Sequence, residues 1–169
     1  MDTQALHKIS YGLYIIGAAK EGNLNAQVAN TVIQVCSEPP TISVCINKKN
    51  LTHTYIENSR AFSISILAQD TPLKFIGGFG FKSGREANKL EGVAYRIGNT
   101  GSPIITDNAV AYLEAKVISQ CDVHTHTIFV GEITDARILK EGEPMTYTYY
   151  QQVKRGTTPK TAPSYIAPR

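Results

Sequence analysis

The sequence predicts a mainly β domain whose strands close into a barrel, with a few short helices between them. Alternating runs of β-branched and aromatic residues recur along the chain, and turn residues such as Glu38-Pro39-Pro40 bound them. Residues 122–125 separate the last two long runs, which predicts a hairpin. Repeated short runs of this kind favour a barrel over an open parallel sheet. The strands are expected at residues 12–19, 28–36, 41–47, 61–67, 93–98, 108–121 and 126–139.

Short helices are expected at 51–59, 70–81 and 83–92. The second opens with the sequence DTP, in which an aspartate cap and an early proline both favour a helix start. The third lies between Ser83, a good N-cap, and Gly92, a good stop.

One domain, residues 1–150, is expected to be followed by an extended, basic, proline-containing C-terminal tail, residues 151–169. The whole chain has a net charge of +3, and the tail holds cations but no acidic residue, so the basic character comes from the tail. Its prolines favour extended chain over a core element.

The composition fits a soluble globular protein: hydrophobic residues make up 42% of the 169 residues and charged residues 18%. No apolar run approaches the ~18 residues that span a membrane, and the N-terminus lacks a secretory apolar segment. We therefore expect a cytoplasmic protein with no membrane contact. The body has no basic stripe with interleaved aromatic residues, which argues against nucleic acid as a partner.

The three cysteines, Cys36, Cys45 and Cys121, stand far apart and form no C-x-x-C pair. A zinc ribbon, rubredoxin centre or iron–sulfur cluster is therefore not expected, and no metal site is predicted. All three cysteines lie in apolar strand-like runs, so we expect them to be small buried hydrophobic residues.

Four amide and hydroxyl side chains, Asn25, Gln27, Asn30 and Thr31, lie beside a stretch, TVIQVC, that is expected to be a buried strand. Buried polar groups cost free energy unless something bonds to them. Either these are ordinary loop residues, or a polar, planar ligand completes their hydrogen bonds.

The segment NKKNLTH joins the end of a strand to the start of a helix. Lys48 and Lys49 precede the helix and Thr52 lies in its first turn. Helix N-termini attract phosphate. The alternative is that both lysines are simply solvated.

The segment SGREANK would place Arg85 and Lys89 on one face of a helix that Ser83 caps. An anion could bind there, or the two cations could pair with Glu86 or Glu91. Two weak anion sites in one small β domain together indicate a ligand with a phosphate and a polar planar body.

His124 and His126 are one residue apart, so in a strand both side chains would share a face. Two histidines alone make a poor metal site. They are either surface residues at the hairpin or, for at least one of them, part of a functional site.

The chain resembles the flavin reductase-like family, the FMN-binding split barrels with Greek-key topology. The resemblance rests on NAQVANTVIQVCSEPPTISVCINKKNLTHTYIENSRAFSISIL, on SGREANKLEG and on HTIFVGEI, in that order. Within the family it is most similar to the flavoredoxins, the ferric reductase-like proteins and the flavoprotein module of high-molecular-weight rubredoxin, whose C-terminus the run YYQQVKRGTTPKTAPSY resembles.

The resemblance implies FMN as the cofactor and assigns residues to its parts. The isoalloxazine would lie along Asn25, Gln27, Val28, Ala29, Asn30 and Thr31. The ribityl chain and phosphate would meet Asn47, Lys48, Lys49 and Thr52. The phosphate site would be completed by Ser83, Gly84, Arg85 and Lys89. His126 would stand beside the ring as the catalytic residue.

Three functions are compatible with this resemblance. The first is an FMN-dependent oxidoreductase that takes electrons from NAD(P)H and passes them to a flavin, a ferric complex or a small redox protein. The second is an electron carrier that serves a rubredoxin or flavodiiron partner without using NAD(P)H. The third is a non-enzymatic barrel that binds FMN or a vitamin B6 phosphate. A homodimer is expected, with the region of Phe75, Phe79 and Phe81 as a candidate contact.

Overall fold

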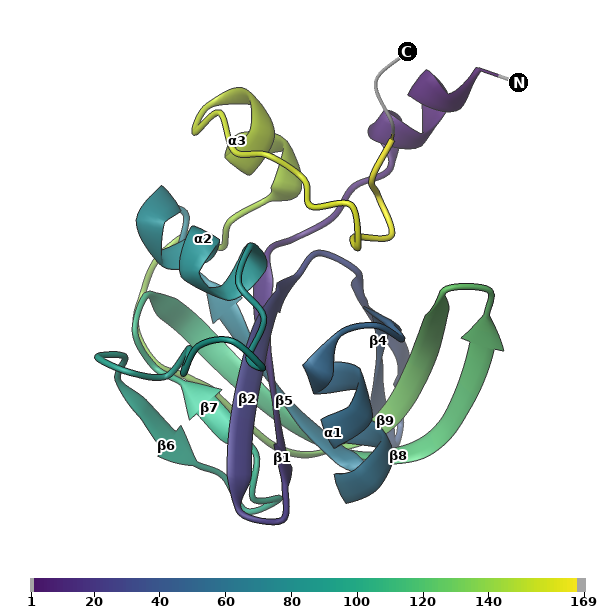
Figure 1. Ribbon diagram of the computed structural model, residues 1–169, viewed down its shortest axis with the longest axis vertical. Coiled ribbons are helices and arrows are strands. Elements are labelled where there is room, and N and C mark those ends of the chain that lie inside the picture. The colour runs from purple at the N-terminus through teal and green to yellow at the C-terminus, as the bar shows by residue number, and fades with distance from the viewer. Residues whose placement is uncertain (1, 167–169) are drawn as a thin grey trace.

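A single antiparallel sheet of seven strands curls into the barrel (Figure 1). The structure is a computed structural model that describes residues 2–166. In spatial order the strands are β2 (Asn23–Ala29), β1 (Tyr14–Lys20), β5 (Ala61–Leu67), β8 (Ala109–Val123), β9 (His126–Ile138), β4 (Pro40–Asn47) and β3 (Val32–Ser37). β2 and β3 are consecutive in the chain but lie at opposite edges of the sheet, so Asn30 and Thr31 bridge the split in the barrel.

Shorter elements surround the barrel. β6 (Tyr95–Ile97) and β7 (Pro103–Ile105) form a separate two-stranded sheet. The helices are η1 (Thr3–Lys8), α1 (Leu51–Ser59), α2 (Leu73–Gly80) and α3 (Tyr147–Gln152). Figure 1 shows α2 and α3 beside one end of the barrel, with the chain after α3 returning across that end.

The core has two parts. Inside the barrel, Ile56 of α1 packs with Ile16, Phe62 and Phe129 of the sheet, all fully buried. Towards α2 and α3, a second cluster includes Phe79 and Tyr147. Fully burying an aliphatic or aromatic side chain contributes about 1.5–3 kcal/mol, so α1 is held chiefly by Ile56 rather than by capping, because its N-cap Asn50 makes no side-chain cap bond.

The predicted mainly β fold is confirmed, as are helix 51–59 and the hairpin between the last two long strands. Helix 70–81 is shorter than predicted, and Asp70 does not cap it. Pro72 is the N-cap, because a residue before proline, Thr71, is kept out of the helical region.

The prediction of a helix at 83–92 is wrong, because this segment forms successive turns. The Ser83 hydroxyl accepts from the Arg85 amide, and the Asn88 side chain accepts from the Leu90 amide. Such local side-chain bonds to the backbone compete with helical hydrogen bonding.

The predicted strand 28–36 breaks at Asn30 and Thr31: its first two residues end β2, and the rest belongs to β3. Residues 23–27 of β2 were not predicted as a strand. Segment 93–98 yields only the short β6, and the sequence did not predict β7, η1 or α3. The expected domain boundary at residues 150 and 151 falls inside α3.

The expectation of a buried TVIQVC strand and of three buried cysteines is wrong. Cys36 and Cys121 are exposed and Cys45 is half-buried. β3 is an edge strand that pairs only with β4, and Cys121 lies where β8 extends beyond the core. Apolar alternation marks a strand, but it does not say whether a second layer covers it.

None of the helices in the described range is long and apolar enough to cross a membrane.

Candidate functional site

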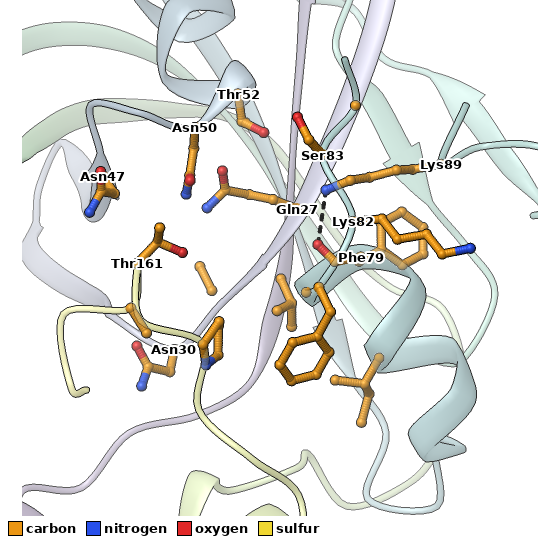
Figure 2. Close-up of a pocket in the computed structure, with 18 of the residues that line it drawn as sticks. Gln27, Asn30, Asn47, Asn50, Thr52, Phe79, Lys82, Ser83, Lys89 and Thr161 are labelled. Atoms are coloured by element: carbon orange, nitrogen blue, oxygen red, sulfur yellow. Dashed lines mark hydrogen bonds between the residues drawn. The ribbon is translucent and has the colours of Figure 1, made fainter. Parts of the chain in front are cut away.

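A cavity opens where the edge strand β2 meets the start of α1 and the turns after α2 (Figure 2). It holds about 1080 Å³ of empty space, counted out to where it opens to solvent, which is enough for a nucleotide-sized cofactor. Residues 47–52, 79–85 and 157–163 supply most of the remaining wall. Segments from four parts of the chain therefore meet at one site.

β2 presents Asn25 and Gln27 to the cavity, because residues two apart share a strand face. Asn25 Nδ2 donates to Thr52 Oγ1 at 2.7 Å, which links β2 to the first turn of α1. Gln27 is only 8% exposed, yet its Oε1 has no hydrogen-bond partner within residues 2–166. An unpaired buried acceptor costs free energy, so Gln27 Oε1 is suited to a donor on a ligand.

Four cations, Lys49, Lys82, Arg85 and Lys89, line the cavity, and we call the part of its wall that they form the cationic end. In the part of the chain that is described, no carboxylate lies within 4.0 Å of any of them. Arg85 Nη1 donates to the Lys49 carbonyl and Lys89 Nζ to the Phe79 carbonyl, each at 3.0 Å. Burial lowers the pKa of Lys89 to about 8. An anion at this end would stabilise all four charges.

Gly84 lets the turns after α2 approach β2 closely. A Cβ at this position would lie 2.0 Å from Asn25 Oδ1 and 3.0 Å from Leu51 Cδ2. Any side chain at residue 84 would therefore displace Asn25, and with it the bond that joins β2 to α1.

A chain of hydrogen bonds fixes the start of α1 against the β8–β9 hairpin. His53 Nε2 lies 2.8 Å from Thr127 Oγ1, Thr127 donates to Asp122 Oδ1 at 2.7 Å, and Lys48 Nζ pairs with Asp122 Oδ2 at 2.8 Å. His53 Nδ1 lies 3.4 Å from the Glu57 carboxylate. Burial lowers the pKa of His53, so the imidazole is neutral near pH 7.

Residues 157–164, which we call the tail strap, cross the other end of the cavity. Thr157, Pro159, Thr161, Ala162 and Pro163 line it. In Figure 2, Thr161 and Asn30 lie on the side of Asn47, whereas Lys82 and Lys89 lie on the opposite side. Lys82 and Lys89 therefore lie away from the strapped end.

The structure brings twelve of the fifteen sequence-predicted site residues to this cavity: Asn25, Gln27, Val28, Ala29, Asn30, Asn47, Lys49, Thr52, Ser83, Gly84, Arg85 and Lys89. Three do not line it. Lys48 points to Asp122, Thr31 Oγ1 donates to Asn30 Oδ1 at 3.0 Å, and His126 contacts the Thr161 carbonyl at 3.1 Å. His124 lies in the hairpin turn with a φ of 49°, so it does not share a strand face with His126.

Sequence reasoning missed several lining residues. Lys82 and Asn50 directly adjoin predicted residues, so a wider window would have included them. Tyr147 and Tyr150 have the i, i+3 spacing of one helix face in the run YTYY, which is a usable signal. The strap carried no periodic signal.

The arrangement suits a ligand with a phosphate at one end and a planar body with hydrogen-bond donors in the middle. The described residues contain no group of three or more His, Cys, Asp or Glu side chains that could hold a metal ion.

Two curated relatives are similar over the whole chain. High molecular weight rubredoxin from Moorella thermoacetica is 56% identical over 169 residues, which are 100% of this chain and 74% of that protein. Ferric-chelate reductase (NAD(P)H) from Archaeoglobus fulgidus is 50% identical over 166 residues, 98% of each.

Solved structures share the fold. The NADH:FAD oxidoreductase SgcE6 of Streptomyces globisporus superposes with a TM-score of 0.78 at 22% identity, covering 86% of this chain and 85% of that one. An FMN-binding protein from Thermus thermophilus gives a TM-score of 0.72 at 25% identity, covering 79% and 74%.

The family model described as "Flavin reductase like domain" matches residues 6–158, and the chain belongs to that family. It is accordingly an oxidoreductase of the flavin reductase type with a flavin-binding fold.

Proposed function

We propose that this protein holds FMN in the cavity and passes electrons from NAD(P)H to a flavin, a ferric complex or a small redox protein. The flavin supplies the redox chemistry when bound, and the chain supplies binding, orientation and the electrostatics around it. The observation that carries this proposal is one cavity that contains four cations and the buried acceptor Gln27 Oε1, for none of which residues 2–166 supply a carboxylate or hydrogen-bonding partner, respectively.

The residues fit FMN part by part. Lys49, Lys82, Arg85 and Lys89 would receive the phosphate, with charge-assisted hydrogen bonds as the main contribution. Gln27 Oε1 would accept from the N–H on the polar edge of the ring. A single cationic cluster favours one phosphate group over a dinucleotide, and the similar fold of a protein named as FMN-binding supports the same choice.

The relatives' names support the rest of the proposal. One is named for ferric-chelate reduction with NAD(P)H and is alike over nearly its full length. The nicotinamide would reach the flavin from the open side of the cavity.

Two measurements test this function. Chromatography of heat-released cofactor should give FMN, and stopped-flow mixing with NADH or NADPH should bleach the bound flavin. Recovery of FAD, or of no flavin after reconstitution, would contradict the cofactor assignment.

An electron carrier without NAD(P)H use is the second candidate, favoured by the 56% identity to high molecular weight rubredoxin. Its partner would be a rubredoxin or flavodiiron protein. In that case neither pyridine nucleotide would bleach the flavin, whereas a reduced redox protein would.

A homodimer is part of the proposal, and of the residues expected at its contact, Phe75, Phe79 and Phe81, only Phe81 is well exposed, at 56%. Phe79 is 2% exposed and belongs to the core. The better-supported surface is the outer face of β3, β4, β9 and β8. There the strand registers align Ile33 with Val130, and Cys45 with Ile128 and Cys121.

This outer face exposes apolar side chains and borders the cavity. Ile33 is 57% exposed and Val123 43% exposed, while Cys45 and Asn47, on the same face, line the cavity wall. A second copy on this face would bury the exposed side chains and close that wall. Light scattering should give twice 18.5 kDa, and Ile33→Glu should give the monomer mass.

A further inference from the structure

The tail strap is pinned on the α3 side of the cavity. Tyr150 donates its hydroxyl hydrogen to the Thr157 carbonyl at 2.8 Å, and the Tyr147 hydroxyl bonds to Thr158 Oγ1. The Gly156 amide donates to the Tyr150 carbonyl at 2.9 Å. The strap therefore leaves α3 in a fixed direction.

The strap is pinned again on the far side, at the split of the barrel. His126 Nε2 lies 3.1 Å from the Thr161 carbonyl, and because a carbonyl only accepts, the nitrogen donates. Asn30 Nδ2 donates to Ser164 Oγ at 2.5 Å. A segment held at both sides of a cavity and lining it between them forms part of its wall.

Three residues assigned to the flavin by resemblance serve this second attachment. Thr31 donates to Asn30 Oδ1, which orients the Asn30 amide towards Ser164. His126 Nδ1 lies 2.8 Å from Thr125 Oγ1, which orients the ring so that Nε2 faces the strap. Asn30, Thr31 and His126 are positioning residues for the strap.

The strap is also stiff and has small side chains. Pro159 and Pro163 restrict its backbone, and turns are closed by the Ala162 amide to the Pro159 carbonyl at 3.0 Å and by the Tyr165 amide to the Ala162 carbonyl at 3.1 Å. Thr161 and Ala162 face the cavity without filling it, which leaves room for a flat group underneath.

We infer that the tail strap covers the ring end of the bound flavin and sets the size of electron acceptor that reaches it. The inference rests on the proposed function, because a phosphate held at Lys89 would direct the ring towards Thr161, which Figure 2 shows on the opposite side of the cavity. Small acceptors such as ferric chelates pass beside the docked strap. A protein acceptor requires the strap to leave Asn30 and His126.

The first test is limited trypsinolysis of the full chain, which can cut after Lys160 inside the strap. Release of fragment 161–169 is followed by mass spectrometry with and without saturating FMN. FMN should slow this cleavage. Ser164→Ala, which removes the acceptor for Asn30, should be cut about fivefold faster than wild type, as the loss of one hydrogen bond predicts. Ser37→Ala at the exposed end of β3 is the matched control and should behave as wild type.

The second test compares acceptors on the FMN-loaded protein. Ser164→Ala should raise the rate with cytochrome c several-fold while leaving the rate with ferric EDTA near wild type. His126→Ala, which removes the donor to the Thr161 carbonyl, should raise the ratio of the cytochrome c rate to the ferric EDTA rate. A general catalytic role for His126 would instead lower both rates together, and that result would overturn the positioning role.

The outcomes separate this inference from the proposed function. If FMN binds but leaves cleavage after Lys160 unchanged, the strap does not cover the flavin and the inference fails alone. If no flavin binds, the proposed function fails. Cleavage of flavin-free Ser164→Ala at the wild-type rate would show that the strap is not docked at Asn30.

Discussion

The polar side chains at the two ends of the cavity differ in what they bond to. At the cationic end, Lys49, Lys82, Arg85 and Lys89 have no carboxylate partner within the described residues, and the two that are hydrogen-bonded donate to backbone carbonyls. At the strapped end, the side chains bond to one another and to the strap. The positive charges at the first end are therefore available to a ligand, whereas the side chains at the second end hold the tail strap in place.

Because of this difference, we expect one end to determine how tightly the flavin binds and the other to determine which molecules reach the flavin ring. The cationic end has the chemistry to hold a phosphate, and the strapped end has the geometry to govern what approaches the ring. Gln27 lies between them, and its Oε1 finds no hydrogen-bond partner in the described part of the chain. Substitutions at the three places should therefore give distinguishable results.

The largest effect is expected at the cationic end. Lys89→Ala or Arg85→Ala should weaken FMN binding by about 1.5–3 kcal/mol, the contribution of a hydrogen bond to a charged group. Riboflavin lacks the phosphate, so its affinity should stay unchanged. Fluorescence titration of both flavins measures this, with Lys74→Ala on the exposed side of α2 as the control. Equal weakening of the two flavins would mean that the variants disturb folding instead.

Gly84→Ala should destabilise the contact between the turns after α2 and β2. Its Cβ would overlap Asn25 Oδ1, and overpacking of this kind lowers the free energy of unfolding by about 1–3 kcal/mol. Both flavins should bind more weakly.

Gly78→Ala is the matched control for Gly84→Ala. A Cβ at residue 78 of α2 meets nothing within 4 Å, and alanine is favoured over glycine in a helix by about 1 kcal/mol. Urea denaturation should therefore give opposite signs for the two variants. A stable Gly84→Ala protein with normal flavin affinity would show that the turns after α2 are looser than their contacts suggest.

Gln27→Met should have opposite effects on the stability of the flavin-free protein and on its affinity for flavin. Without flavin, removal of the unpaired Oε1 should raise the free energy of unfolding by about 1 kcal/mol. With flavin, FMN and riboflavin should both lose affinity, by equal factors, because the contact is to the ring. A loss confined to FMN would place Gln27 at the phosphate instead.

The smallest effect is a pH dependence of FMN affinity. The pKa of Lys89 is lowered by burial to about 8 in the flavin-free protein, and a bound phosphate raises it. FMN binding therefore takes up a proton above pH 8, so affinity should fall with rising pH there, by less than tenfold per pH unit. Riboflavin titrations and Lys89→Ala should show a flatter profile between pH 7.5 and 9.5.

The same lowered pKa affects stability without flavin. Unfolded chain binds more protons at Lys89 than folded chain between pH 8 and the ordinary value of 10.5. The contribution of this group to stability therefore improves as pH rises through that window.

Much of the site was predictable because its contacts are local or follow strand alternation. Asn25 and Gln27 share a face of β2 by period alone, and Lys49 and Thr52 flank a helix start that the sequence predicts with the correct bounds. The spacing of Arg85 and Lys89 pointed to the segment 83–89, but the helix expected there was wrong, since Ser83 and Asn88 bond to the backbone.

The strapped end could not be predicted, because it depends on contacts between distant segments. Asn30 and Ser164 are 134 residues apart, and His126 and Thr161 are 35 apart. Polar residues that adjoin cavity-lining residues along the sequence resemble ligand contacts, even when their hydrogen-bond partner is a distant segment of the chain. The exposed β3 shows the same limit for apolar residues, because only the sheet order places it at an edge.

The hydrogen-bond chain behind α1 has a fixed direction. Thr127 has one hydroxyl hydrogen and gives it to Asp122, so His53 must donate through Nε2, which leaves Nδ1 facing Glu57 as the only nitrogen that can gain a proton. Acidification therefore adds charge at the outer side of the ring without reversing any bond that holds the cavity wall. Because burial lowers the pKa of His53 below 6.5, the unfolded chain takes up that proton first, and stability declines as pH falls below 6.5. Mild acid therefore lowers the free energy of unfolding through Nδ1, on the side of the ring away from Thr127.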